Sequence, residues 1–209
     1  KMASGTIRGR FIEQQKIRQA CSSVAAGTWI TENDIDAAAV QCWTSIQNQY
    51  GCAACLTMSM LGNQLVPCAC EVDVAGVVSM YALTLASHNP SALLDWNNNF
   101  GADRDMCVCT HCSNYPKDFV GGDIEISELD ILGNTLGREN CFGAVKGKVK
   151  AGPMTFFRIS TDDTRGSIKA YLGEGEFTGD AYGMDGGIAV CRVNDLQELL
   201  KFMCKTGFE

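Results

Sequence analysis

VPCACEVDVAGVVSMYALTLA, residues 66–86, joins a short apolar segment to a longer one. The first part ends at Glu71, and a short apolar run bounded by a polar residue is typical of a buried strand. The second part, residues 72–86, is apolar almost all round, which predicts a helix buried inside the fold rather than lying on its surface. A buried strand followed by a buried helix indicates an α/β arrangement.

Two further short apolar segments end in a side chain that can bind metal or move a proton. Residues 92–94 end at Asp95, and residues 106–110 end at His111. In open α/β sheets, side chains at the carboxyl ends of strands converge on one crevice. We therefore expect Glu71, Asp95 and His111 to lie together. Each also has a structural explanation: a carboxylate near a helix N-terminus, a turn residue and a core histidine.

The remaining pattern indicates helices first and strands later. Residues 7–26 have apolar side chains at three- and four-residue steps, which predicts an amphipathic helix, and residues 51–62 predict another. After about residue 120, glycine-rich turns separate strand-like runs, as in an antiparallel sheet or barrel, and a helix is expected at the end of the chain. The expected fold class is α/β plus β. Residues 1–118 would be the end of an α/β sandwich domain, and residues 119–209 an antiparallel β-barrel-like domain with a C-terminal helix.

Composition and charge narrow the class of partner. Of the 209 residues, 46% are hydrophobic, and 17 Lys and Arg against 24 Asp and Glu give a net charge of −7. Basic runs that could follow a phosphate backbone are missing from the sequence, which disfavours nucleic acid and anionic membrane surfaces. No apolar run approaches the roughly 18 residues of a spanning helix. We expect a cytoplasmic protein with no nucleic-acid or membrane partner.

Twelve cysteines form a second distinctive feature of the composition. Most lie in apolar stretches, where free cysteine commonly behaves as a small buried hydrophobic residue. The alternative is a thiolate site for zinc or an iron–sulfur centre. Its candidates are the C-x-x-C pair Cys52 and Cys55 and the run of thiols and imidazole over residues 107–112. A structural zinc site usually needs two matched pairs, and only one C-x-x-C is present.

Two carboxylates and one imidazole suggest a particular chemistry. Such a set suits Mn²⁺, Mg²⁺ or a similar divalent ion, with positions left for substrate oxygens. A bound ion can polarise a carbonyl and the neighbouring hydroxyl. With a carboxylate beside it to take and return a proton, the site could run proton transfer next to a carbonyl through an enediol.

Three segments carry a resemblance to a known family: residues 39–43 (AVQCW), 68–76 (CACEVDVAG) and 94–98 (LDWNN). They resemble the C-terminal half of the L-fucose and L-arabinose isomerase family, and the resemblance runs from about residue 6 to the end. It implies a metal-dependent isomerase that converts an aldose into a ketose through an enediol, with a monosaccharide as substrate and Mn²⁺ as the most expected cofactor.

The resemblance also implies roles for single residues. Glu71 and Asp95 would be catalytic, moving the proton between C1 and C2, and both would hold the metal together with His111. The matching histidine is a ligand in the arabinose branch and lies near the site in the fucose branch. Three residues would lie near the sugar: Gln41, Trp43 and Asn97.

The end of the chain and its expected assembly also follow from the resemblance. The family has a further histidine ligand shortly after a segment like Gly207-Phe208-Glu209, and it has preceding N-terminal domains. We therefore expect this chain to be a C-terminal fragment of a protein that forms a homo-oligomer when full length. The alternative function is a non-catalytic sugar-binding or structural module of the same fold.

Overall fold

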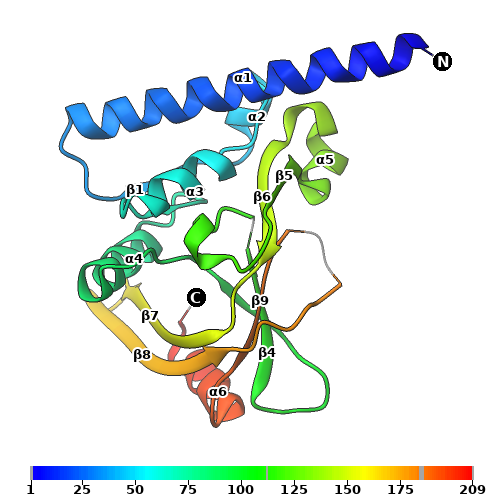
Figure 1. The fold of residues 1–209 in the computed structure, drawn as a ribbon. Coiled ribbons are helices and arrows are strands. Elements are labelled where there is room, and N and C mark those ends of the chain that lie inside the picture. Colours follow the sequence, from blue (N-terminus) through cyan, green and yellow to red (C-terminus); the bar gives the residue numbers. More distant parts are fainter. Residues whose placement is uncertain (1, 112, 184–185, 209) are drawn as a thin grey trace.

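The computed structural model describes residues 2–111, 113–183 and 186–208 (Figure 1). Cys112, from the thiol run, and Glu209, from the terminal segment, lie outside the described residues. The long first helix lies at one end of the molecule and the last helix at the other, with the strands between them.

The first half of the chain is mainly helical. Its helices are α1 (Met2–Glu32), α2 (Ser45–Tyr50), α3 (Cys55–Asn63) and α4 (Val74–Ser87). Two short strands, β1 (Ala38–Ala39) and β2 (Cys68–Ala69), pair in parallel between them. The strand and helix expected within residues 66–86 are thus present as β2 and α4.

Helix α1 is longer than the predicted helix and buries a different face. Ile17 and Val24 are 62% and 68% exposed, whereas Gln19 is buried. The Gln19 amide Nε2 donates to the carbonyl oxygens of Ala53 and Phe142, each at 2.7 Å. Hydrogen bonds to backbone carbonyls of a loop and of the first residue of a strand therefore anchor this part of α1. None of the described helices combines the length and the apolar character needed to cross a membrane.

Helix α4 is only half buried, so the prediction of a helix buried all round is wrong. Val77 and Met80 are buried, while Val74, Val78 and Leu85 are 61%, 47% and 56% exposed. One side of the helix packs against β2 and against strand β7 (Gly152–Asp162). No described element covers its other side. One apolar face of α4 therefore remains on the surface.

A seven-stranded, mostly antiparallel sheet forms the centre of the molecule. Its strands are β3 (Asp95–Asn99), β4 (Met106–His111), β5 (Glu125–Glu128), β6 (Phe142–Lys148), β7 (Gly152–Asp162), β8 (Ser167–Phe177) and β9 (Gly187–Arg192). The order is β3-β4-β9-β6-β5, with β8 on β9 and β7 on β8. Among the described strands of this sheet, only β6 and β9 pair in parallel. The remaining helical segments are η1 (Lys117–Phe119), α5 (Asp130–Leu136), η2 (Arg138–Asn140) and α6 (Leu196–Thr206).

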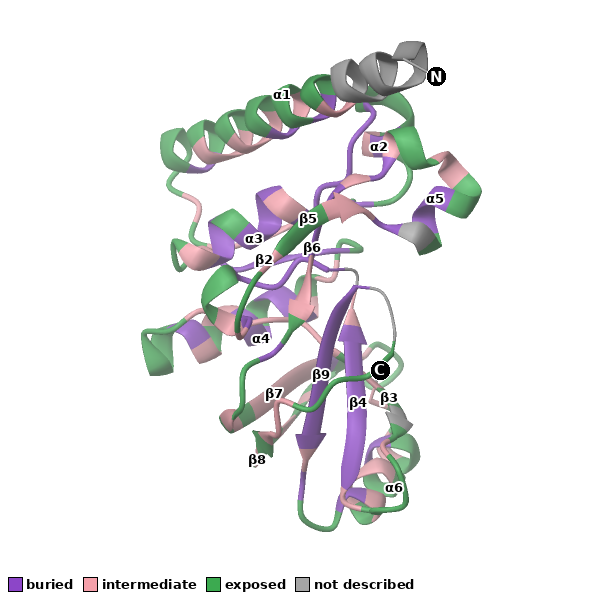
Figure 2. Ribbon diagram, turned by 45° about the vertical axis from the view of Figure 1, so that its right-hand side comes forward, coloured by how far each residue is buried: buried purple, intermediate pink, exposed green. Residues whose placement is uncertain are grey.

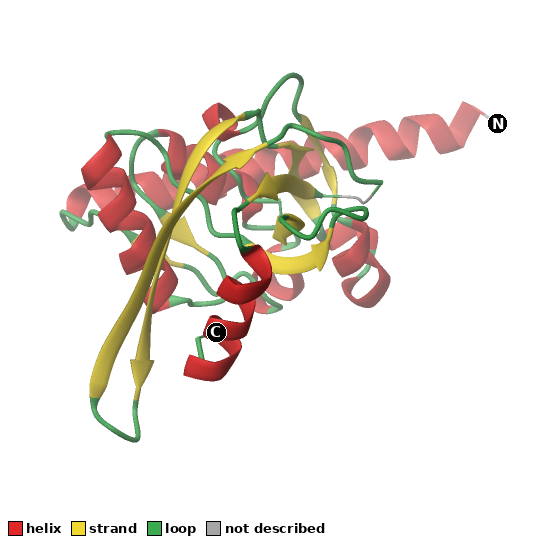
Figure 3. Ribbon diagram, turned by 90° about the horizontal axis from the view of Figure 1, so that it is seen from below, coloured by secondary structure: helices red, strands yellow, loops and turns green. Residues whose placement is uncertain are grey.

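The mostly antiparallel sheet and the C-terminal helix agree with the expected fold, but the described strands do not close into a barrel. Strand β8 meets β9 only at Glu176 and Phe177, so the long β7–β8 hairpin extends away from the sheet (Figure 3). Strands β3 and β4 precede residue 119 and still share the sheet with β6 and β9. The sheet thus joins both sides of the boundary expected near residue 118.

The main hydrophobic core lies on β4 and β9, which are buried along most of their length (Figure 2). Tyr115 and Leu196 are 1% and 0% exposed and pack in the same cluster. Burying a leucine side chain of this kind stabilises a fold by roughly 1.5–3 kcal/mol. Since α6 begins at Leu196, this contact holds the last helix against the sheet.

Most of the cysteines belong to these cores. Nine of the eleven described cysteines are buried thiols, while Cys21 and Cys204 are exposed. This confirms the prediction of reduced, buried cysteines for those nine. Among the residues that the structure describes, Cys52 and Cys55 do not belong to a close group of metal-binding side chains.

Candidate active site

A cavity of about 670 Å³ lies between α4, β4, the β7–β8 hairpin and α6. Glu71, Asp95 and His111 all line it. The geometry behind this convergence differs from the expected one: residues 92–94 form no strand, and Asp95 begins β3 instead of following a strand. Antiparallel pairing places Asp95 opposite Thr110, next to the end of β4. The same end of the β3–β4 pair therefore carries both Asp95 and His111.

Glu71 lies two residues after β2, on an unusual backbone. Glu71 and Val72 have φ angles of 62° and 57°, in the left-handed region that residues other than glycine rarely adopt. Such a conformation costs of order 1–3 kcal/mol and is found mainly where the surrounding structure enforces it. Here the Glu71 N–H donates to Cys42 Sγ at 3.3 Å, and Trp43 Nε1 donates to Glu71 Oε1 at 3.1 Å. These contacts fix both the backbone and the carboxylate.

Asp95 has a carboxyl whose pKa is raised above its ordinary value. The main cause is loss of hydration where the carboxyl faces the cavity; the positive charge of His111 opposes the rise, and the negative charge of Glu71 adds to it. A carboxyl that keeps its proton to higher pH is suited to hold a proton and return it.

His111 is the last residue of β4 and has a thiol beside its ring. Its Nδ1 and Nε2 atoms lie 3.2 and 3.6 Å from Cys70 Sγ. One ligand atom from each of Cys70, Glu71 and His111 lies within 4.8 Å of the others. Asp95 is outside this tight group, although it lines the same cavity and interacts electrostatically with Glu71 and His111. The closest metal-competent set therefore contains Cys70 in addition to two of the predicted ligands.

The donor chemistry around the cavity fits a divalent cation. The carboxylates of Glu71 and Asp95 and the imidazole of His111 are the kinds of ligand that ions such as Mn²⁺ take from proteins. The Cys70 thiol adds a softer donor, of the kind that favours zinc. The residues thus fit the metal that the resemblance implies without selecting one ion.

Gln41 and Trp43 line a smaller depression of about 300 Å³ next to the cavity. Glu71 and Val72 line it too, so Glu71 borders both spaces. Trp43 is 42% exposed, and its indole N–H is directed to the Glu71 carboxylate. The structure therefore brings these two predicted residues to Glu71, where Trp43 positions the carboxylate.

Asn97 lies apart from the cavity-lining residues. It is on β3, and its Oδ1 accepts hydrogen bonds from the backbone N–H and the hydroxyl of Thr110, at 2.8 and 2.6 Å. These bonds stabilise the irregular pairing of β3 with β4. The described contacts of Asn97 are thus within the sheet.

Arg158 on β7 brings a positive charge to the cavity. Its Nη1 pairs with Asp73 Oδ2 at 2.5 Å, and the other carboxylate oxygen of Asp73 caps α4 by accepting from the N–H of Gly76 at 2.7 Å. Arg158 Nε is buried and has no hydrogen-bond partner among the described residues. One donor of this guanidinium therefore remains for a ligand.

Cys70 and Arg158 were missed at the sequence level. Cys70 precedes Glu71, but its apolar neighbours made it a core residue in the pattern. Arg158 lies in a strand nearly ninety residues further along, and only the packing of β7 against α4 brings it to the cavity. A local pattern cannot report such a contact.

Comparison with known proteins bears on this site. Residues 109–209 match the family model described as L-fucose isomerase, C-terminal domain. A sulfoquinovose isomerase of Alkalicoccus urumqiensis is 27% identical over 150 residues, which cover 70% of this chain and 32% of that protein. One of Priestia aryabhattai is 28% identical over 132 residues, covering 63% and 28%. One of Clostridium sp. (strain MSTE9) is 35% identical over 63 residues, covering 30% and 14%.

These matches confirm the resemblance predicted from the sequence. The chain is similar to sulfoquinovose isomerases, and residues 109–209 are similar to the C-terminal domain of L-fucose isomerase. The chain spans about a third, or less, of the length of the curated relatives it matches.

Proposed function

We propose that this chain is the site-bearing C-terminal part of a sugar ketol-isomerase, an intramolecular oxidoreductase that interconverts an aldose and a ketose. The observation that carries the proposal is the placement of Glu71, Asp95 and His111 on one cavity in a relative of such isomerases. As part of the same proposal, the full-length protein forms a homo-oligomer in the cytoplasm.

Glu71 and Asp95 perform the proton transfer in this proposal. A carboxylate takes the proton from C2 of the aldose, and the C1 oxygen gains a proton, which gives an enediol. The proton then returns to C1 while the C2 hydroxyl releases its own proton, which gives the ketose. The raised pKa of Asp95 suits the protonated stage, and the fixed Trp43 contact keeps the Glu71 carboxylate oriented. When bound by Glu71, Asp95 and His111, a divalent cation, Mn²⁺ in our proposal, would polarise the C1 carbonyl and the C2 hydroxyl.

The test is turnover by the full-length protein carrying Glu71→Gln or Asp95→Asn. Each variant is expected to lose roughly 10²–10⁴-fold in turnover, because each removes a group that moves the proton. Glu174→Gln, an exposed carboxylate on β8, is the matched control and should keep wild-type turnover. Unchanged turnover in both site variants would overturn the catalytic assignment and favour a non-catalytic sugar-binding module.

The relatives named sulfoquinovose isomerase suggest a sulfonated sugar as substrate, and Arg158 is the group that would bind its negative charge. The cavity holds this guanidinium, and the Nε donor that lacks a partner is free to bind a sulfonate oxygen. The distal end of the sugar would then lie toward β7 while its C1–C2 end lies at Glu71 and Asp95.

Arg158→Lys tests this substrate assignment. Losing a hydrogen bond to a charged group costs about 1.5–3 kcal/mol, so KM for sulfoquinovose should rise about 10- to 150-fold. KM for a neutral aldose that the wild type also converts should change little. Arg165→Lys, an exposed arginine on the same hairpin, is the control. Equal changes for both sugars would exclude Arg158 as the sulfonate-binding group.

A further inference from the structure

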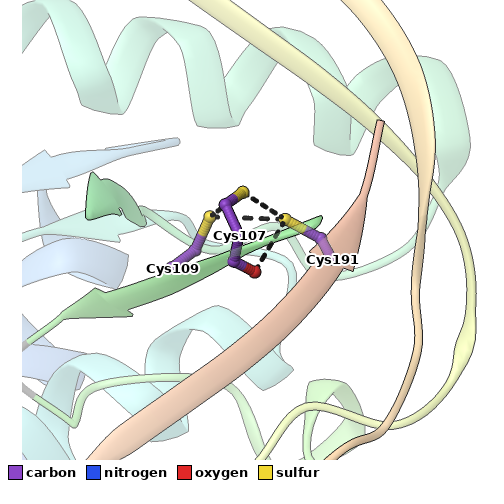
Figure 4. A group of neighbouring side chains, drawn as sticks. All are labelled: Cys107, Cys109 and Cys191. Carbon is purple, nitrogen blue, oxygen red and sulfur yellow. Dashed lines mark hydrogen bonds between the residues drawn. The ribbon is translucent and has the colours of Figure 1, made fainter. Parts of the chain in front are cut away.

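Three buried thiols meet away from the carboxylate site. Cys107 and Cys109 on β4 and Cys191 on β9 point toward one another (Figure 4). Cys191 Sγ lies 3.2 Å from Cys107 Sγ and 3.5 Å from Cys109 Sγ, and the two thiols of β4 are 3.9 Å apart. Their residues are 3%, 5% and 0% exposed. All three sulfur atoms are therefore available to a single small ligand.

The register of the sheet dictates this convergence. Cys107 and Cys191 are direct partners across the antiparallel pair of β4 and β9. Cys109 lies two residues from Cys107, and alternate residues of a strand point to the same face. The three side chains thus leave one face of two adjacent strands, and the backbone fixes their spacing.

The surroundings separate this group from bulk water but leave a path to it. The thiols belong to the main core, with Ala189, Val193 and other apolar side chains around them. Cys109 also lines the cavity that holds the candidate active site. An ion that reaches the cavity would meet Cys109 first.

We propose that Cys107, Cys109 and Cys191 form a three-sulfur binding site for one soft, thiophilic cation of the zinc, cadmium or copper(I) class. Thiolates select such ions over the hard ions that carboxylates prefer. At a metal–sulfur distance of about 2.3 Å, a tetrahedral arrangement separates sulfur atoms by about 3.8 Å. The observed distances reach this value after side-chain shifts of a few tenths of an ångström. The cation displaces the thiol protons, which leave to solvent.

Cadmium binding to the reduced, chelator-treated chain tests the proposal, because thiolate-bound Cd²⁺ gives an ultraviolet charge-transfer band. One equivalent should bind with an X-ray absorption signal of three sulfur neighbours. Cys107→Ala and Cys191→Ala should each remove the band and weaken binding by at least the roughly 10- to 100-fold that loss of a supporting contact costs a metal site. Cys141→Ala, equally buried but in another cluster, is the matched control and should keep the band.

Cys70→Ala distinguishes this site from the thiol near His111, because it should leave the three-sulfur signal intact. The X-ray measurement on the wild-type chain needs no variant, so it decides the question even where a core variant does not fold. A shell with fewer than three sulfur atoms, a band lost in Cys70→Ala, or a disulfide between Cys107 and Cys191 in place of metal binding would overturn the proposal.

Discussion

The two ends of β4 present different chemistry on the same face of one strand. At the end of the strand, His111 meets Glu71 and Cys70 at the wall of an open cavity. Toward its start, Cys107 meets Cys191 in the core. Alternation along the strand places these side chains on one side, and exposure decides what each can do. The His111 end, at the cavity, suits ions that prefer oxygen and nitrogen donors. The Cys107 end, in the core, suits ions that prefer sulfur donors.

Trp43→Phe sharpens the comparison at the cavity end, because it removes the donor that orients Glu71 and leaves the thiols untouched. The lost hydrogen bond is worth about 0.5–1.5 kcal/mol, so turnover of the full-length protein should fall about 2- to 10-fold. Trp29→Phe, an exposed tryptophan on α1, is the matched control for loss of an indole. If the two variants have equal turnover, the Trp43 contact does not position Glu71 for the reaction.

Asp95→Asn tests how the partial desolvation of the Asp95 carboxyl affects the stability of the fold, an effect smaller than the loss of turnover. The pKa of Asp95 is raised in the folded state, so ionising its carboxyl costs stability as the pH rises through that pKa. The variant should therefore be more stable than the wild type at neutral pH, by less than about 1 kcal/mol, because the Asp95 carboxyl is only partly removed from water and solvent screens its charge. The difference should vanish below the ordinary Asp pKa of about 3.9.

Thermal unfolding of wild type and Asp95→Asn, at neutral pH and at a pH below about 3.9, measures this difference in stability. Glu174→Gln provides the control, since its carboxylate is exposed and lies away from the cavity. A variant that is less stable than the wild type at neutral pH would show that the Asp95 carboxylate stabilises the fold, against the direction of its pKa.

The sequence correctly predicted that Glu71, Asp95 and His111 lie together, but it did not predict the strand pairing that brings them together. Glu71 follows a strand as expected, but Asp95 and His111 are neighbours because β3 and β4 are antiparallel. A run of apolar residues does not encode the direction of its partner strand. The polar side chains at the ends of apolar segments were still the right candidates, because parallel and antiparallel pairing can both bring segment ends to the same end of a sheet.

Local sequence patterns could not predict contacts between segments that are far apart in the chain. The apolar periodicity of residues 7–26 predicted the helix, yet Gln19 makes its buried contacts and Val24 is exposed. Cys191 is eighty-four residues from its partner Cys107, and the sequence gives no sign of that register. Helix α4 shows the same limit, because its composition is apolar all round while described elements cover only one side.

The most direct measurement of the central claim is Mn²⁺ affinity of the full-length protein, followed by the paramagnetic resonance of the ion. Wild type and Cys191→Ala are expected to bind Mn²⁺ alike, since the hard ion uses the oxygen and nitrogen donors of the cavity. The double variant Glu71→Gln/His111→Ala should lose at least about 100-fold in affinity, because it removes two proposed ligands. Equal Mn²⁺ affinity in the double variant and the wild type would contradict a metal site at Glu71, Asp95 and His111.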